Sequence, residues 1–170
     1  MSRAIIFCGL PGSGKTTLSE IVSERLGIVR CCEDDVKIEL YRQKSGTSLQ
    51  ESDRFSREVN VRLFQFIDEA LESGHDIVCD ATFDRLGNAD RIAHIAESGH
   101  VVRVVVCRID EPERERRFRS RERHPAHHDA ERCFMRNDFD YRIMSDPKLF
   151  LDTDTAIGDS VECILSFLED

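Results

Sequence analysis

Apolar runs of strand length alternate along this chain with longer segments in which apolar residues recur every three or four positions. The apolar runs cover residues 4–8, 28–32, 77–80, 101–107 and 149–151. The periodic segments, which predict helices, cover residues 15–26, 36–43, 48–73, 88–98, 110–123, 129–141 and 161–168. Strands that alternate with helices predict crossover connections and a parallel sheet with helices on both faces. We therefore expect a single three-layer α/β/α domain over residues 1–170.

Local capping signals place several of the helix boundaries. Ser48 and Glu51 have the spacing of a capping box ahead of the longest predicted helix, and Asn88 is a favourable N-cap for the next one. Pro112 suits the first turn of the helix that follows residue 110, and Pro125 ends that helix. Together with the periodicity, these signals predict where the helices begin and end.

The first apolar run leads directly into a glycine-rich segment. Gly9-Leu10-Pro11-Gly12-Ser13-Gly14-Lys15-Thr16 fits the pattern G-x-x-x-x-G-K-[ST], with a predicted strand before it and a predicted helix after it. In such a loop, backbone N–H groups and the positive end of the helix dipole form a cradle for a polyphosphate. The predicted nucleotide contacts are Gly9, Pro11, Gly12, Ser13, Gly14, Lys15, Thr16 and Thr17. Lys15 is expected to reach the β- and γ-phosphates, and the Thr16 hydroxyl is a candidate Mg²⁺ ligand.

Acidic residues follow two other predicted strands. Asp34 and Asp35 come after the strand at 28–32, and Asp80 closes the strand at 77–80. The carboxyl ends of parallel strands share one edge, where ligands bind in open α/β sheets, so these carboxylates are expected to face the same crevice as the glycine-rich loop. Either Asp34 or Asp35 could accept a proton there. Asp80 could hold Mg²⁺ through water or bind a substrate hydroxyl, and the alternative is a cap on the following turn.

Composition and charge limit the class of ligand. A length of 170 residues suits one domain, and a net charge of −9 argues against a long track for nucleic acid. No stretch has the pattern of a signal peptide or a membrane span, which favours a cytosolic protein without membrane contact. The seven cysteines include no C-x-x-C pair and fall mostly on predicted strands, so we expect reduced thiols rather than a zinc site.

Arginines gather in the predicted helix at 110–123. Arg114, Arg117 and Arg121 share one stripe of it. The position of the helix after the fourth predicted strand, between two prolines, favours a mobile lid that closes on substrate and excludes water. The alternative is a solvated helix whose glutamates pair locally with its arginines. Arg85, nearer the sheet edge, could bind an anionic substrate group or be an ordinary surface arginine.

Taken together, these motifs resemble the small P-loop kinases. The loop at 9–17, the pair Asp34-Asp35, the segment Asp80-Ala81-Thr82, Arg85 and the arginine-rich helix are similar to the group of polynucleotide kinases, zeta toxins and chloramphenicol phosphotransferases, often called AAA-type predicted kinases. The resemblance implies a five-stranded parallel sheet, ATP with Mg²⁺ as donor, and a lid over about residues 111–128. It implies that Asp34 is the base on the acceptor hydroxyl and that Arg117 and Arg121 contact the phosphates.

The resemblance also bears on the acceptor. Lys37 stands where a polynucleotide kinase is expected to carry an arginine for the substrate phosphate. Because lysine lacks the bidentate fork of arginine, this difference weakens the case for a nucleic-acid substrate. Asp35, Lys37, Asp80 and Arg85 are nevertheless the candidate substrate contacts.

The leading hypothesis is an ATP-dependent phosphotransferase acting on a hydroxyl of a small molecule or nucleotide, with no obligate protein partner. A kinase for nucleic-acid 5′ ends is an alternative within the same class. An ATP-hydrolysing switch that remodels a partner is an alternative from another class, although Asp80 lacks the adjacent glutamate that AAA-type ATPases use to activate water. A GTPase is disfavoured, since Asp84–Gly87 fits D-x-x-G but the chain has no N-K-x-D motif.

Overall fold

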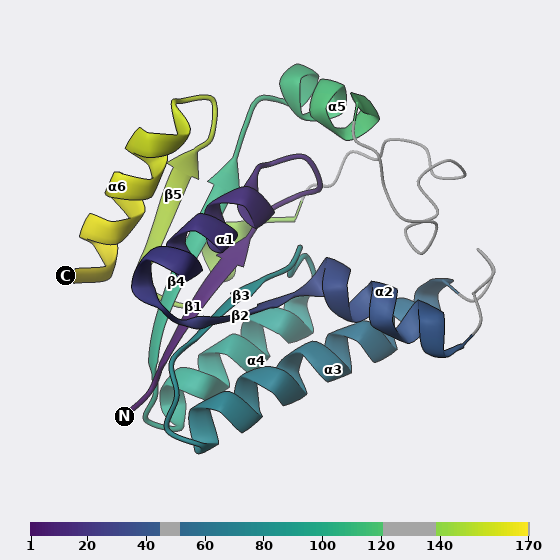
Figure 1. The fold of residues 1–170 in the computed structure, drawn as a ribbon, viewed down its shortest axis with the longest axis vertical. Helices are drawn as coiled ribbons and strands as arrows, with labels where there is room; N and C mark the ends of the chain where they lie inside the picture. Colours follow the sequence, from purple (N-terminus) through teal and green to yellow (C-terminus); the bar gives the residue numbers. More distant parts are fainter. Residues whose placement is uncertain (45–51, 121–138, 170) are drawn as a thin grey trace.

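The computed structural model describes residues 1–44, 52–120 and 139–169, and in them it shows one parallel sheet (Figure 1). The strands are β1 (Arg3–Cys8), β2 (Val29–Cys32), β3 (Ile77–Asp80), β4 (Val101–Arg108) and β5 (Lys148–Asp152). Their order across the five-stranded sheet is β2-β3-β1-β4-β5, and every neighbouring pair is parallel. The predicted fold class and the five-stranded sheet are confirmed.

Register places the ends of three strands next to one another. Phe7 of β1 pairs with Asp80 of β3, and Asp80 pairs with Cys32 of β2. The segments that leave these strands therefore start from the same edge of the sheet, as the sequence predicted.

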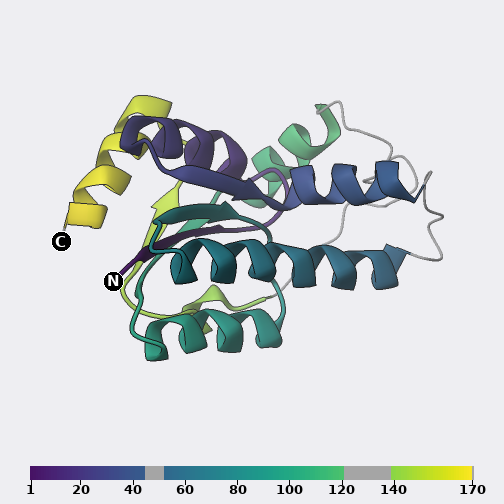
Figure 2. The same ribbon diagram turned by 60° about the horizontal axis from the view of Figure 1, so that its bottom comes forward.

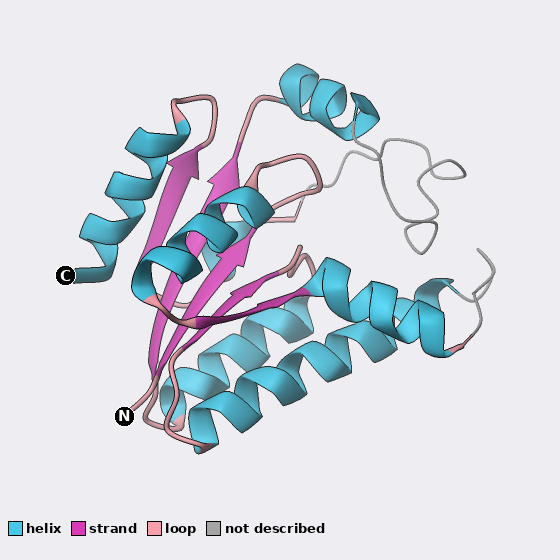
Figure 3. Cartoon of the chain, viewed as in Figure 1, coloured by secondary structure: helices cyan, strands magenta, loops and turns pink. Residues whose placement is uncertain are grey.

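Helices cover both faces of the sheet (Figures 2 and 3). On one face lie α1 (Lys15–Leu26) and α6 (Ile157–Glu169), and on the other lie α3 (Ser52–Glu72) and α4 (Leu86–Glu97). Alternate residues of β1 belong to separate cores, because Ile5 and Phe7 pack with α1 and α6 while Ala4 and Ile6 pack with α3 and α4. Two further helices, α2 (Glu33–Gln43) and α5 (Glu111–Ser120), follow the carboxyl ends of β2 and β4, and a 3₁₀ turn, η3, spans Tyr141–Ile143.

Three helices begin earlier than predicted, and the last of them, α6, begins at Ile157 rather than near Val161. The second helix begins at Glu33, not near Val36, so Glu33, Asp34 and Asp35 form its first turn, where carboxylates interact favourably with the helix dipole. Asn88 is not an N-cap, because α4 begins at Leu86 with Arg85 at the cap position. Asn88 is instead buried inside the helix, and its Oδ1 accepts a hydrogen bond of 2.9 Å from Asn60 Nδ2 of α3.

Some predictions fall on residues that the structure does not describe. The capping box of Ser48 and Glu51, the lid beyond Ser120, Arg121 and residues 129–138 of the predicted helix at 129–141 lie outside the described part. The described end of that segment differs from the prediction, since Phe139 and Asp140 are not helical and Tyr141 begins the 3₁₀ turn.

Among the described residues, no helix is both long enough and apolar enough to cross a bilayer. The strand cysteines are free thiols packed in or against the core, as predicted; these are Cys8, Cys31, Cys32, Cys79 and Cys107.

Candidate functional site

The candidate site lies at the carboxyl ends of β1 and β3. The helices that follow these two adjacent strands, α1 and α4, cover opposite faces of the sheet (Figure 1). In open α/β sheets such a reversal opens a crevice in which ligands bind. The glycine-rich loop occupies this position.

Three glycines of the loop have backbone conformations that other residues rarely adopt. The φ angles are +145° at Gly9, +90° at Gly12 and +85° at Gly14. A Cβ at Gly9 would lie 2.5 Å from the carbonyl oxygen of Cys107, and one at Gly12 would lie 2.8 Å from that of Arg114. Glycine is therefore required both by the backbone angles and by close approach to β4 and α5.

The inner side of this loop suits an anion. Gly14 is the N-cap of α1 and supplies no side chain to satisfy the first N–H groups of the helix. Ser13 is 1% exposed, and its Oγ has no hydrogen-bond partner in the described part of the chain. Lys15 is also buried, and its charge acts on the neighbouring thiols of Cys8 and Cys107. An uncapped helix start, an unpaired hydroxyl and a buried ammonium group together fit a polyphosphate.

Asp80 is the best-connected polar group of the site. Its side chain is 1% exposed, and its Oδ1 accepts hydrogen bonds from Thr16 Oγ1 at 3.0 Å and Cys32 Sγ at 3.4 Å. Its Oδ2 accepts from Ser19 Oγ at 2.7 Å and Arg30 Nη1 at 2.8 Å. The donors of these hydrogen bonds belong to α1 and β2 and not to the turn that follows Asp80. They therefore do not support the alternative that Asp80 caps that turn. The adjacent oxygens of Thr16 and Asp80 form a donor set that suits Mg²⁺.

Burial fixes the protonation state of the thiol beside Asp80. Burial chiefly raises the pKa of Cys32 to about 12, and the charges of Asp80 and Asp34 raise it further. The thiol therefore keeps its proton at neutral pH and can donate a hydrogen bond to Asp80. Because Asp34 acts on Cys32, it lies within electrostatic range of this cluster.

The two predicted acidic candidates differ in exposure. Asp34 is half-buried in the first turn of α2, whereas the side chain of Asp35 is 71% exposed. Asp35 Oδ2 lies 3.7 Å from Arg30 Nη2. Lys37 is also half-buried on α2. The end of β2 thus brings Asp34 to the same edge of the sheet as the glycine-rich loop.

The helix α5 packs on the glycine-rich loop. Arg114 is buried, and its Nη1 lies 3.5 Å from the carbonyl oxygen of Pro11. Arg117 Nε donates to Glu113, and its Nη2 lies 3.4 Å from the carbonyl oxygen of Thr153. A Cβ on Gly14 would lie 3.8 Å from Arg117 Nη1, so this guanidinium is beside the start of α1. Arg121 lies outside the described residues.

The arginines on the outer side of α5 form the local pairs with glutamates that the alternative interpretation of this helix predicted. Arg116 donates to Glu113, and Arg119 donates to Glu115. These arginines are exposed, and the pKa of Glu113 falls to about 2 through its hydrogen bonds to Arg116 and Arg117. Local pairing therefore describes one side of the helix, whereas Arg114 and Arg117 face the loop.

A segment far along the chain contacts the glycine-rich loop from outside. Thr153, which follows β5, is buried, and its Oγ1 lies 2.8 Å from the carbonyl oxygen of Ser13 and 3.1 Å from that of Arg108. Its hydroxyl therefore joins the ends of β4 and β5 to the glycine-rich loop.

The segment after Asp80 is held from two sides. Glu33 accepts hydrogen bonds from the backbone N–H of Thr82 at 2.9 Å and from its hydroxyl at 3.3 Å. The Tyr141 hydroxyl donates to the Thr82 carbonyl oxygen at 2.7 Å, and burial chiefly raises the Tyr141 pKa. Phe83 is buried with a φ of +48°, an uncommon conformation for a residue with a side chain. These contacts fix residues 82–84 beside the crevice.

Arg85 lies beyond the carboxyl end of β3, at the edge of the sheet that carries the candidate site. It is exposed at the N-cap of α4, and within the described ranges no hydrogen bond or ion pair joins it to the glycine-rich loop. Thr17, another predicted contact, is exposed on the first turn of α1.

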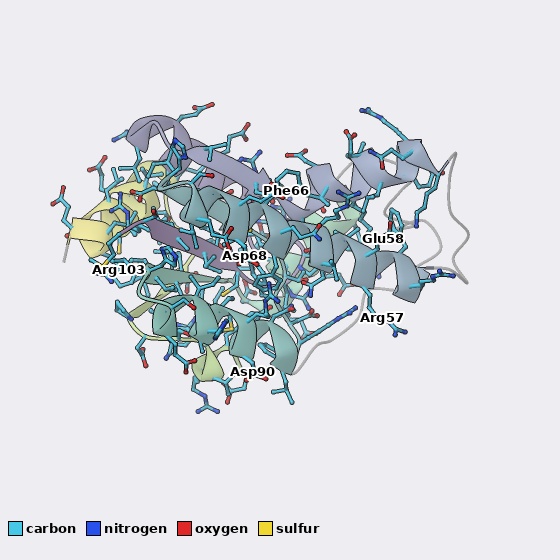
Figure 4. The ribbon with its side chains drawn as sticks, turned by 90° about the horizontal axis from the view of Figure 1, so that it is seen from below. Arg57, Glu58, Phe66, Asp68, Asp90 and Arg103 are labelled. Carbon is cyan, nitrogen blue, oxygen red and sulfur yellow. The ribbon has the colours of Figure 1, made fainter. Side chains whose placement is uncertain are left out.

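A separate groove of about 720 Å³ lies along the edge strand β2, between α2 and α3. Arg30, Asp35 and Phe66 are among its lining residues. Phe66 lies on α3 (Figure 4) and is 48% exposed. No described residue of the glycine-rich loop lines this groove, so the groove is separate from that loop.

Sequence patterns missed four residues of this site: Ser19, Arg30, Arg114 as a loop contact, and Thr153. Arg30 gave one usable signal, because a charged residue within a short apolar strand needs a partner when it is buried. Ser19 lies three positions after Thr16 and so shares its helix face. Thr153 gave no signal, since its partner is far away in sequence.

Solved structures with the same architecture include small kinases. A candidate kinase from Chloroflexus aurantiacus is 20% identical, with a TM-score of 0.78 and 98% of each chain covered. The APS kinase of Mycobacterium tuberculosis, solved with AMPPNP and APS, is 20% identical, with a TM-score of 0.67, covering 99% of this chain and 98% of that one. The shikimate kinase of Bacteroides thetaiotaomicron is 16% identical, with a TM-score of 0.66 and 98% of each chain covered. This likeness shows the P-loop kinase fold.

Among curated proteins, no sequence matches this chain. A family model described as AAA domain (AAA_33) matches residues 5–136, which include the glycine-rich loop, Asp34, Asp80 and α5. Since the match covers more than half of the sequence, this chain belongs to that AAA domain family.

Proposed function

We propose that this protein is an ATP-dependent kinase that moves the γ-phosphoryl group of ATP to a hydroxyl of a small molecule or nucleotide. The observation that carries the proposal is the contact of 3.0 Å between Thr16 Oγ1 and Asp80 Oδ1. Thr16 follows the glycine-rich loop, in which the buried Ser13 hydroxyl has no hydrogen-bond partner among the described residues. The structural neighbours named for APS and shikimate support transfer to a small acceptor.

The glycine-rich loop would bind the triphosphate. Backbone N–H groups at the start of α1, the Ser13 hydroxyl and the Lys15 ammonium group would contact its oxygens. Thr153 and α5 hold the loop in this shape from outside, through Ser13 and Gly12. The loop therefore needs little rearrangement to bind its ligand.

Thr16 and Asp80 would hold the Mg²⁺ that accompanies ATP. Magnesium offsets phosphate charge and orients the transferred group. Both oxygens of Asp80 already accept hydrogen bonds from protein donors, which favours contact through water rather than direct ligation.

Asp34 would accept the proton of the acceptor hydroxyl. Phosphoryl transfer needs a carboxylate near the γ-phosphate to orient the nucleophile and take its proton. Asp34 is half-buried at the end of β2, two strands from the loop, whereas Asp35 points into solvent beside Arg30. We therefore assign the base to Asp34 and a binding role at the acceptor entrance to Asp35 and Lys37.

Lys15 and Arg117 would stabilise the charge of the transferring group. Positive groups placed in advance around that charge account for much of the rate enhancement in phosphoryl transfer. Arg117 already lies beside Gly14, and Arg121 is proposed to join it from the segment after α5.

Transfer of label from γ-labelled ATP tests this function. The acceptor panel should contain APS, shikimate, other small polyhydroxy compounds, nucleosides and a 5′-hydroxyl oligonucleotide. Label on a small hydroxyl compound or nucleoside is the expected result, and it should disappear with Lys15→Ala. Label on the oligonucleotide end alone would replace the proposal with a polynucleotide kinase. Release of phosphate without any labelled acceptor would instead indicate an ATP-hydrolysing switch.

A further inference from the structure

Arg30 holds a permanent positive charge beside the Asp80 carboxylate, which is proposed to bind Mg²⁺ through water. Arg30 belongs to β2, and its side chain is 19% exposed. Its Nη1 donates to Asp80 Oδ2 at 2.8 Å, and its Nη2 lies 3.7 Å from Asp35 Oδ2. Arginine stays charged at any physiological pH, so this ion pair is permanent in the free protein.

The hydrogen bonds around Asp80 leave little capacity for another ligand. A carboxylate offers about four lone-pair directions. Thr16 and Cys32 donate to Oδ1, and Ser19 and Arg30 donate to Oδ2. A divalent cation that coordinated Asp80 directly would have to displace at least one of these donors.

Electrostatics points in the same direction. A cation next to Asp80 would approach the Arg30 guanidinium, whose contact is only 2.8 Å long, and also the Lys15 ammonium group of the same crevice. Because the charge of Asp80 is already balanced, the free protein offers a divalent ion little net attraction. A bound triphosphate changes this balance, since its own oxygens supply negative charge and metal ligands.

We propose that Arg30 is a positioning residue that holds Asp80 in place and prevents a free divalent cation from binding beside Thr16 before a nucleotide arrives. The metal then enters only as its complex with the polyphosphate. This inference rests on the proposed function, because that function identifies the ligand that carries the metal as a nucleotide. The test itself uses no nucleotide.

The test measures binding of Mn²⁺ to the nucleotide-free protein, through loss of the electron paramagnetic resonance signal of free Mn²⁺. Arg30→Met removes the charge, and Arg30→Gln removes the charge but keeps a donor for Asp80. Arg30→Lys keeps the charge. Arg25→Met is a matched control, because Arg25 forms an exposed ion pair with Glu162 at 2.8 Å, away from the crevice.

The wild-type protein, Arg30→Lys and Arg25→Met should show no saturable Mn²⁺ binding at millimolar concentrations. The two neutral Arg30 variants should bind Mn²⁺ at least about tenfold more tightly, because a repelling unit charge within a few ångströms has been removed. Adding Asp80→Asn to Arg30→Gln should abolish the gain. Equal Mn²⁺ affinities in the wild type and in Arg30→Gln would overturn the proposal.

Thermal unfolding provides a second measurement if Arg30→Met is poorly folded. Removing Arg30 leaves the buried Asp80 charge without its ion-pair partner, so the neutral variants should melt below the wild type in EDTA. Mn²⁺ should restore part of that loss, whereas it should leave the wild-type melting temperature unchanged. A destabilised Arg30→Gln that Mn²⁺ does not restore would show that Arg30 is merely structural. Failure of the kinase assay alone would not affect either measurement.

Discussion

Individual carboxylates in this crevice have different surroundings and hence different roles. Asp80 is 1% exposed and accepts hydrogen bonds from α1 and β2, so it organises the site. Asp34 is half-buried in the first turn of α2 and close enough to influence the Cys32 thiol. A group that receives a proton must remain accessible to its substrate, and Asp34 satisfies this requirement better than Asp80 does.

Lys15→Ala should lower kcat by about 10²–10³-fold, because it removes a cation preplaced for the transition state. The measurement is steady-state transfer of label to the acceptor found in the panel. Arg25→Ala, on the same helix but exposed and paired with Glu162, is the control and should retain wild-type activity. Equal turnover by Lys15→Ala and the wild type would contradict the assignment of the phosphate site.

Asp34→Asn should leave the affinity for ATP unchanged and lower kcat by about 10²–10⁴-fold, since it removes a proton acceptor but no phosphate contact. ATP affinity is measured by equilibrium titration and kcat by label transfer. The neighbouring substitution Asp35→Asn is the matched control and should have a much smaller effect on kcat. If Asp35→Asn loses transfer while Asp34→Asn keeps it, the base is Asp35.

Among the elements, α5 and the glycine-rich loop form one packed unit. Gly12 has a φ of +90°, and a Cβ there would lie 2.8 Å from the carbonyl oxygen and 3.3 Å from Cγ of Arg114. The same helix carries Arg117 to the start of α1. The shape of the glycine-rich loop therefore depends on how closely α5 approaches it. Arg114 provides this contact from the inner side of a helix whose outer side forms local ion pairs.

Gly12→Ala should move α5 away from the loop and weaken ATP binding by about tenfold or more, since the new Cβ meets backbone that cannot shift alone. Gly99→Ala is a matched control, because Gly99 also has a φ of +90° but has no atom within 4 Å of a Cβ. The control should lose about 1–2 kcal/mol of stability through backbone strain and keep its ATP affinity. Equal ATP affinities in both variants would show that the contact with α5 does not shape the cradle.

Across the whole molecule, local patterns predicted what local physics determines. The parallel sheet followed from the alternation of apolar runs and helical periodicity, and the loop at 9–16 followed from its glycine spacing and its flanking strand and helix. Asn88 was wrongly predicted to be an N-cap. Its side-chain amide accepts a hydrogen bond from Asn60 of another helix, and this contact overrides its preference for a cap position. The start of α2 was predicted too late because Glu33, Asp34 and Asp35 were assigned to the end of the preceding strand rather than to a favourable first turn of the helix.

The features of the site that the sequence did not predict depend on contacts between residues far apart in the chain. Arg30 and Asp80 meet only because β2 and β3 are adjacent in the sheet, and Thr153 meets Ser13 only because β5 ends near the loop. Nothing in the spacing of these residues along the chain indicates their proximity. The sequence thus predicted the glycine-rich loop and its flanking strand and helix, while the ion pair that balances Asp80 required the folded structure.

Calorimetric titration of the wild-type protein with ATP in the presence of Mg²⁺ tests the central claim most directly. A nucleotide held by the loop of residues 9–16 should give saturable heat for one site per chain, and Lys15→Ala should bind markedly more weakly. GTP, titrated under the same conditions, reports whether the protein distinguishes adenine from guanine. Absence of heat with both nucleotides would contradict the account.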